Sequence, residues 1–179
     1  SWGDEDPRPF GFDAAVAFPP HKEWDAPGIN AAVEMLDQEY KGNIHDYDYL
    51  AKRATSAPPT EYKLFPCVCP SWDNEARKPR KGTAFAFSTP EKYGAWLTYA
   101  CQRALSEFKP EERLVFINAW NEWAEGAYLE PDRHFGFAYL HETASVLSRL
   151  GAPRPLAAGD LRLAVVVHDA AFYGAQLLA

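Results

Sequence analysis

The sequence predicts an α/β fold on three observations. Short apolar runs alternate with longer stretches in which apolar residues recur with the helical period. The run that begins at Leu114 is apolar without alternation, which is typical of a strand covered on both faces. Polar residues follow directly after this run and after the run that ends at Pro70. These features together indicate strands joined by helices, with a site at the strand ends.

Strands are predicted where β-branched and aromatic residues form short runs bounded by Pro, Gly or polar clusters. The first run is closed by Pro19 and Pro20. In chain order, the expected strands are Gly11 to Phe18, Leu64 to Pro70, the run from Leu114 and Leu161 to His168.

Helices are predicted where apolar residues recur at every third or fourth position. Thr89 is expected to cap a long helix that has Pro90 at its first position and reaches Phe108. Its regular apolar face indicates core packing and no chemistry. Other helices are expected at Tyr47 to Ala54, at Phe137 to Leu147, weakly at Ala31 to Leu36, and in the residues that follow His168.

Two glutamates, Glu122 and Glu125, lie three residues apart just after the apolar run from Leu114. Glycosidic bond chemistry needs one group to protonate the leaving oxygen and another to assist at the sugar. In a tight turn these carboxyl groups would be about 5 Å apart, the separation linked to retention of configuration. The aromatic side chains of Trp120, Trp123 and Tyr128 are interleaved with them and offer flat faces to a sugar ring. The alternative is a solvated acidic loop without chemistry.

Further substrate-binding candidates follow the other predicted strands, and parallel strands would bring them to the same face. Asn121 is expected to orient a glutamate or a sugar hydroxyl. The remaining candidates are Trp72, Asp73, Asn74 and Arg77 after the second strand, and His21 after the first.

Several of these residues also have structural interpretations. Asp73 suits a loop-capping aspartate, and His21 suits an ordinary surface residue. Glu130 and Asp132 are as compatible with ion pairs to Arg133 as with substrate contacts.

The same residues resemble a known family. NEWAEG at Asn121 to Gly126, followed by LEPD, is similar to the hallmark of the glycoside hydrolase family 99-like domain, and in particular to its WbsX branch of bacterial polysaccharide-biosynthesis glycosyltransferases. Other blocks resemble that branch in the same order, namely GFDAAVAFPPH at Gly11 to His21, PCVCPSWDNEAR at Pro66 to Arg77, and STPEKYGAWL at Ser88 to Leu97.

The resemblance implies a (β/α)8 barrel of the TIM type and assigns a role to each glutamate. Glu122 would assist at the sugar 2-hydroxyl and Glu125 would be the acid/base, through a 1,2-anhydro sugar and no covalent enzyme bond. It also implies that a rhamnan-synthesis or glycosyltransferase-like domain follows, because LAVVVH resembles such a start.

The chain of 179 residues is shorter than the roughly 250 that such a barrel needs. We therefore expect residues 1–150 to be the C-terminal part of a barrel truncated at its N-terminus. Residues 151–160, rich in Pro, Ala and Gly, would be a linker, and residues 161–179 the start of the following domain. The isolated piece is expected to be inactive.

Composition narrows the possible partners. A net charge of −7 disfavours nucleic acid, and no apolar run approaches a membrane span. The basic cluster from Arg77 to Lys81 is compatible with a solvated loop and equally with the binding of an anionic donor or glycan. The three cysteines form no disulfide framework and favour the cytoplasm. Cys67 and Cys69 suit small core residues on one face of a strand.

No cofactor or metal is expected, because the histidines are too scattered for a ligand set. Together with the paired glutamates, the resemblance implies an enzyme that makes or cleaves glycosidic bonds in bacterial surface polysaccharide, of the lipopolysaccharide O-antigen type, with hydrolase and transferase both open. Its partners would be an oligosaccharide or polysaccharide and the neighbouring domains of a longer chain. The alternative is a non-catalytic glycan-binding or scaffolding module of a polysaccharide-assembly protein.

Overall fold

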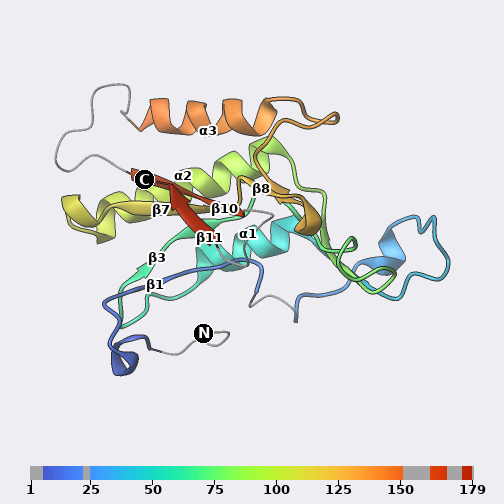
Figure 1. Cartoon of the computed structure of the whole chain (residues 1–179), viewed down its shortest axis with the longest axis horizontal. Helices are drawn as coiled ribbons and strands as arrows, with labels where there is room; N and C mark the ends of the chain where they lie inside the picture. The colour runs from blue at the N-terminus through green and yellow to red at the C-terminus, as the bar shows by residue number, and fades with distance from the viewer. Residues whose placement is uncertain (1–5, 22–24, 151–161, 169–174, 179) are drawn as a thin grey trace.

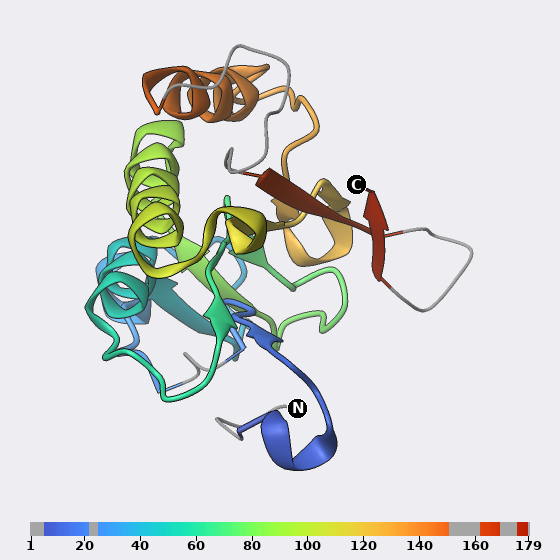
Figure 2. The same cartoon turned by 90° about the vertical axis from the view of Figure 1, so that its left-hand side faces the viewer.

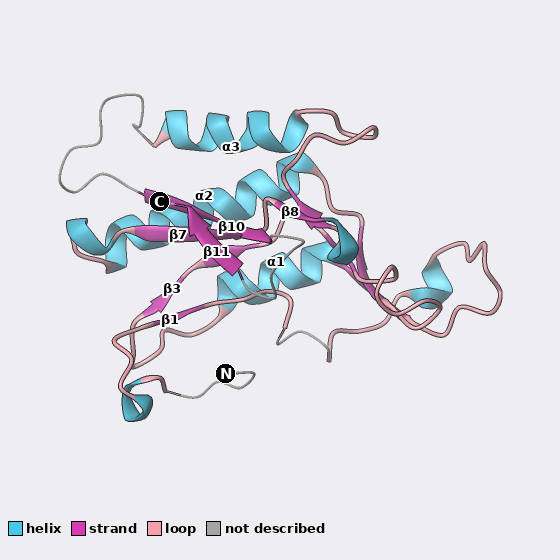
Figure 3. Cartoon of the chain, viewed as in Figure 1, coloured by secondary structure: helices cyan, strands magenta, loops and turns pink. Residues whose placement is uncertain are grey.

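The computed structural model of the chain describes residues 6–21, 25–150, 162–168 and 175–178, and it has the predicted α/β architecture. Three helices stack along one side of the central strands (Figures 1 and 2). The strands of the described residues form several small sheets that do not close into a barrel. Strands, helices and connecting loops can be followed in Figure 3.

The central sheet has the strand order β11-β10-β7-β4. Its members are β4 (Cys67–Val68), β7 (Leu114–Asn118), β10 (Arg162–His168) and β11 (Ala175–Leu178). β4, β7 and β10 are parallel, and β11 runs antiparallel to β10. The apolar run from Leu114 is therefore a central strand, as its composition predicts.

The helix that was predicted after His168 differs from the observed structure. A helix was expected after His168, but residues 175–178 form β11. Backbone pairing with β10 overrides the helical preference of this short segment. The predicted linker lies outside the described residues. The predicted start of a following domain includes β10, which the structure places beside β7, and the domain division stays a prediction.

The remaining strands are short and come from three further sheets. β1 pairs with β3, β2 with β6 and β6 with β5, and β8 with β9. Their bounds are β1 (Ala15–Val16), β2 (Asn43–Asp46), β3 (Leu64–Phe65), β5 (Trp72–Asp73), β6 (Thr83–Ala86), β8 (Asn121–Glu122) and β9 (Ala127–Tyr128). The first predicted strand is thus much shorter than expected, because only Ala15 and Val16 find a partner in β3.

The three α-helices match the predicted periodic segments. They are α1 (Tyr47–Ser56), α2 (Pro90–Glu107) and α3 (Ala138–Arg149). The Thr89 side chain accepts a hydrogen bond from the Lys92 backbone N–H at 3.3 Å, which confirms the predicted cap of α2. The weak helix expected at Ala31 to Leu36 is wrong, because only a 3-10 turn, η2 (Asn30–Ala32), forms there.

The hydrophobic core packs against β7, the strand that precedes the two glutamates. The buried face of α2 includes Tyr93, Leu97 and Cys101, and it packs in one cluster with Val115 and Ile117 of β7. Each large apolar side chain buried in this way contributes about 1.5–3 kcal/mol. The periodic face of α2 is therefore core packing, as predicted, and it holds β7 in place.

All three cysteines are free and buried. Burial raises the pKa of the Cys101 thiol to about 12 and raises the pKa of Cys67 further. Cys67 packs with Phe116, whereas Cys69 belongs to the main core, so the two do not share one face. β4 ends at Val68, and strand alternation does not extend to Cys69.

Candidate active site

Two loops at the carboxyl ends of the central strands carry the predicted site residues. The arginine loop, residues 71–77, follows β4 and contains β5. The glutamate loop, residues 120–132, follows β7 and contains β8, the turn η4 (Trp123–Glu125) and β9. Because β4 and β7 are adjacent and parallel, both loops leave the same end of the sheet.

The two loops are joined by a close backbone contact. The Ser71 hydroxyl donates a hydrogen bond to the carbonyl of Gly126. Gly126 has a φ of +60°, and a Cβ at this position would lie 2.8 Å from the backbone nitrogen of Asp73. Glycine is therefore required both by the left-handed backbone and by the packing. This junction holds the turn with the glutamates against the arginine loop.

The guanidinium of Arg77 contacts both glutamates. Its Nη2 lies 2.8 Å from Glu122 Oε1, and its Nε lies 3.6 Å from Glu125 Oε1. The Glu122 side chain is only 6% exposed, whereas the Arg77 side chain is 48% exposed. A buried carboxylate is costly without a partner, and Arg77 supplies the positive charge. The structure thus brings three of the predicted site residues together.

Asn74 and Asp73 shape the arginine loop. Asn74 is buried, and its side-chain oxygen accepts a hydrogen bond from the Thr83 backbone N–H at 2.7 Å. Its carbonyl accepts from the Arg77 backbone N–H at 3.0 Å. The Asp73 carboxylate accepts from the Glu75 N–H at 2.9 Å, which is the loop-capping contact that the sequence allowed. Asn74 thus holds the backbone of Arg77, and Asp73 caps the start of the same turn.

Trp72 and His21 pack against each other. Trp72 is 2% exposed and belongs to the main core. The His21 ring meets it edge-on, with ring centroids 5.6 Å apart. Burial lowers the pKa of His21, although a backbone hydrogen bond with Phe18 opposes this shift. His21 is therefore a half-buried packing partner of Trp72 and not an ordinary surface residue.

An aromatic stack forms the exposed side of the glutamate loop. The rings of Trp123 and Tyr128 are stacked with centroids 3.8 Å apart and an interplanar angle of 16°. Trp123 is 47% exposed, and its indole N–H donates to Glu130 at 2.6 Å. The Tyr128 hydroxyl donates to Asp132 at 3.1 Å. Burial, followed by this bond to Asp132, raises the pKa of Tyr128 to about 12. The acids Glu130 and Asp132 thus hold the stack.

Trp120 and Asn121 connect the stack to the core. The Trp120 ring packs against the main core, and its carbonyl accepts backbone hydrogen bonds from Leu129 at 2.8 Å and Glu130 at 3.1 Å. Asn121 pairs with Tyr128 across β8 and β9. Of the predicted aromatic candidates in this loop, Trp123 therefore presents the largest exposed face.

The Ser71–Gly126 junction was not predicted from the sequence. A glycine directly after a short helical turn is a common left-handed cap, and this signal could have identified Gly126. Nothing in the sequence links it to Ser71, which lies 55 residues away. Among the described residues, no group of three or more His, Cys, Asp or Glu side chains could hold a metal ion.

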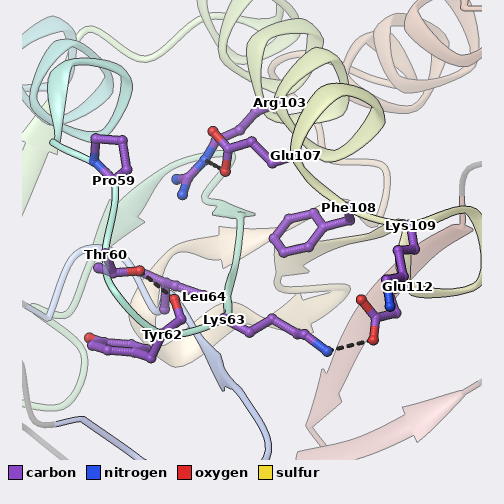
Figure 4. Close-up of a pocket in the computed structure, with 10 residues that line it drawn as sticks. All are labelled: Pro59, Thr60, Tyr62, Lys63, Leu64, Arg103, Glu107, Phe108, Lys109 and Glu112. Atoms are coloured by element: carbon purple, nitrogen blue, oxygen red, sulfur yellow. Dashed lines mark hydrogen bonds and ion pairs between the residues drawn. The ribbon is translucent and has the colours of Figure 1, made fainter.

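A cavity of about 310 Å³ lies at the opposite end of the strands. It is lined by the chain that leads into β3 and by the end of α2, including Lys63, Phe108 and Glu112 (Figure 4). Lys63 pairs with Glu112 there, and Arg103 pairs with Glu107. Figure 1 shows the turn before β7 at one end of this strand and β8 at the other. The cavity is therefore separate from the glutamate site.

Comparison with known proteins places both site loops in one family segment. Residues 1–143 match the family model described as glycosyltransferase WbsX. The chain belongs to the glycosyltransferase WbsX family. It is also similar to proteins named "Uncharacterized protein WxcX" from two strains of Xanthomonas campestris pv. campestris, each 42% identical over 144 residues.

These alignments cover 80% of the chain and 21% of each relative, so the WbsX-family chain spans about a fifth of the length of the curated relatives it matches. No solved structure matches it. Within the described residues, no helix combines the length and the apolar character needed to cross a bilayer.

Proposed function

We propose that the glutamate site makes or cleaves glycosidic bonds in the synthesis or remodelling of bacterial surface polysaccharide, such as the O-antigen of lipopolysaccharide. Membership of the glycosyltransferase WbsX family supports a role in polysaccharide biosynthesis. The observation that carries the proposal is the pair Glu122 and Glu125 on one guanidinium, beside an exposed aromatic stack. Carboxylates and flat apolar faces are what sugar chemistry requires.

The proposed reaction divides the work between the two acids, with the roles taken from the family 99-like resemblance. Glu125 protonates the oxygen of the leaving group, while Glu122 removes the proton of the sugar 2-hydroxyl. The freed oxygen attacks the anomeric carbon as the glycosidic bond breaks, which gives a 1,2-anhydro sugar. An acceptor hydroxyl or water then opens this ring, with Glu125 as base and Glu122 returning its proton. The net result is retention of configuration.

We also propose that the central strands belong to a (β/α)8 barrel. β4 is followed by α2 and the parallel strand β7, and β7 is followed by α3 and the parallel strand β10. Such repeated units are the building blocks of that fold, and the glutamates follow the carboxyl end of one strand, where barrel active sites lie. An experimental structure of the protein at its natural length would test this arrangement.

The activity is tested with the protein at its natural length. Glycans from surface polysaccharide are incubated with water alone, or with nucleotide-sugar donors and a labelled acceptor, and the products are separated by mass. Products that need both donor and acceptor identify a transferase, and products formed in water identify a hydrolase. If neither forms, and Glu125→Gln behaves as wild type in every assay, the proposal is wrong.

A second candidate function is a glycan-binding module. The exposed Trp123–Tyr128 stack favours it, because a binder needs only such a face and hydrogen-bonding acids. A binder would hold glycan in wild type without turning it over, and Glu125→Gln would change only the affinity. Calorimetric titration beside the product assay separates the two functions.

A further inference from the structure

We infer that Phe87 is a further substrate-binding residue of the glutamate site, an exposed ring on which a sugar of the glycan stacks. The inference rests on the function proposed above, and it extends the aromatic surface of the site beyond Trp123 and Tyr128. Phe87 is not among the residues that the sequence predicts for the site.

Phe87 has a backbone conformation that disfavours its own side chain. It directly follows β6, and its φ is +65°. A Cβ is crowded in this left-handed region, so glycine or asparagine is the usual residue there. A phenylalanine at such a position keeps its ring at a cost in stability. Local conflicts of this kind are typical of functional residues.

Arg80 is the other non-glycine residue with a positive φ among the described residues, at +62°. Its side chain has an evident role within the protein, because the guanidinium pairs with Asp37 and Glu39. The Phe87 side chain lacks such a role. Phe87 is 56% exposed, and its ring contacts no other aromatic ring of the described residues. A ligand would account for this ring as the ion pairs account for Arg80.

Strand pairing brings Phe87 to the carboxyl ends of the central strands. β6 runs antiparallel to β5, with Phe85 opposite Trp72. Because the two strands run in opposite directions, the chain that leaves β6 at Phe87 heads toward Ser71, which precedes β5. The Ser71 hydroxyl donates to the Gly126 carbonyl of the glutamate loop. The strand that carries Phe87 is therefore joined to the glutamate loop through β5.

The start of α2, which follows Phe87, also lies beside the glutamate loop. Tyr93 of α2 packs against Tyr139 of α3, with ring centroids 5.5 Å apart. Tyr139 meets Phe135 edge-on at 5.3 Å, and the Phe135 N–H donates to Asp132 at the end of the glutamate loop. Figure 1 shows the green start of α2 at the same end of the strands as β8. Phe87 thus lies at the end of the molecule that carries the acids.

The chemistry of the ring indicates the part of the glycan that it contacts. A phenyl ring neither donates nor accepts a conventional hydrogen bond, so its ligand has to present an apolar face. The C–H groups on one side of a sugar ring form such a face. The hydroxyl groups of the glycan are left to the acids and amides of the site.

The test uses the protein at its natural length and three replacements at one position. Phe87→Ala removes the ring and keeps the crowded Cβ, Phe87→Gly removes both, and Phe87→Trp keeps a flat face. By calorimetry, Phe87→Ala and Phe87→Gly should weaken glycan binding about tenfold, by analogy with other rings that stack on an exposed aromatic face. Phe87→Trp should stay within a few-fold of wild type. In the product assay KM should rise while kcat stays within a few-fold, because the ring transfers no proton.

Thermal melts distinguish ligand binding from a structural role. Phe87→Ala should melt close to wild type, as exposed substitutions usually do. Phe87→Gly should melt above Phe87→Ala, because glycine adopts a left-handed backbone without crowding. If the ring instead packs against another part of the longer chain, both variants will melt well below wild type. That result would overturn the inference.

Phe10 provides a matched control. It is a phenylalanine that is 65% exposed, in the turn η1 (Arg8–Phe10), which Figure 1 shows in dark blue, far from β8. Phe10→Ala should leave the glycan Kd unchanged. An equal loss of affinity in Phe10→Ala and Phe87→Ala would make the effect unspecific and overturn the inference.

The remaining outcomes separate the inference from the proposed function. If Phe87→Ala and Phe87→Gly bind glycan as wild type does, while Trp123→Ala binds it more weakly, the inference is overturned and the function stands. If wild type neither binds nor converts any glycan, the function fails and the role of Phe87 fails with it.

Discussion

At the amino ends of the central strands, two ion pairs join one cation to one acid, Lys63 to Glu112 and Arg103 to Glu107. At the carboxyl ends, one guanidinium is shared by two glutamates. The first arrangement balances charge at an open cavity. The second brings a nearly buried acid and a second acid to a single cation, beside an exposed aromatic face.

The difference shows that the cavity and the reactive side chains lie at different ends of the central strands. The amino-end pairs are exposed or half-buried, and such pairs contribute about 0–1 kcal/mol each. The carboxyl-end residues are fixed by a glycine junction, a buried asparagine and a backbone turn. Reactive groups need this kind of fixed geometry more than they need a large cavity.

The largest expected difference between the two ends is in stability. Trp72→Ala should lower the free energy of unfolding by about 3–5 kcal/mol, because the ring that anchors the arginine loop in the core is removed. Lys63→Met at the amino end should cost less than about 1 kcal/mol. Chemical denaturation of both variants measures the difference. Equal losses would show that the two ends are supported alike.

The next effect concerns turnover. Glu122→Gln and Glu125→Gln should each lower kcat by about 10² or more, because each removes one partner of the proposed proton transfers. Glycan binding should stay within a few-fold. Glu112→Gln, an acid paired at the amino end, is the matched control and should keep its wild-type kcat. A normal rate in either site variant would remove that glutamate from the mechanism.

A smaller effect is expected on glycan affinity. Trp123→Ala should weaken binding by about 1–2 kcal/mol, by analogy with other rings that stack on an exposed aromatic face. Phe108→Ala removes an aromatic ring from the amino-end cavity and should leave the glycan Kd unchanged. Calorimetry on the folded variants provides both values. Weaker binding in Phe108→Ala alone would move the glycan site to the other end.

The smallest expected effect is on the pH dependence of the free energy of unfolding. Burial alone would raise the pKa of Asp132, but hydrogen bonds from the Phe135 N–H, the Tyr128 hydroxyl and the His134 N–H outweigh it, and the pKa is lowered. The ionised carboxylate therefore stabilises the fold above about pH 4, and this contribution is lost as the pH falls below that value.

Asp132→Asn should accordingly be less stable than wild type at pH 7, and the gap should close in acid. Solvent screening keeps the gap below about 1 kcal/mol. Thermal melts at several pH values measure it. A gap that stays constant down to pH 3 would mean that the charge of Asp132 does not support the loop.

Local patterns made much of the scaffold predictable. The 3.6-residue period of α2, its Thr89 cap and the apolar run of β7 all depend on neighbouring residues, and the structure confirms them. β2 and β6 were not predicted, because each is short and each is paired with a distant segment. The segment that forms β11 was wrongly expected to be helical, because its four residues are too few to show a strand pattern.

The candidate site could be predicted as a set of residue types but not as a geometry. The glutamates stand out in the sequence because acids and tryptophans follow an apolar strand. The contact from Arg77 to Glu122 spans 45 residues, and it depends on the Ser71–Gly126 junction and on the turn held by Asn74. Long-range contacts of this kind leave no local pattern.

The buried thiols of this chain have a practical consequence for studying the arginine loop by spectroscopy. Thiol reagents such as maleimides are attacked by the thiolate, and burial both shields the native cysteines and raises the pKa of Cys67 and Cys101. A maleimide dye should therefore react much faster with one exposed cysteine introduced as Lys78→Cys, next to Arg77, than with the native thiols. Fluorescence from that dye would report loop movement as glycan is added, without a cysteine-free background.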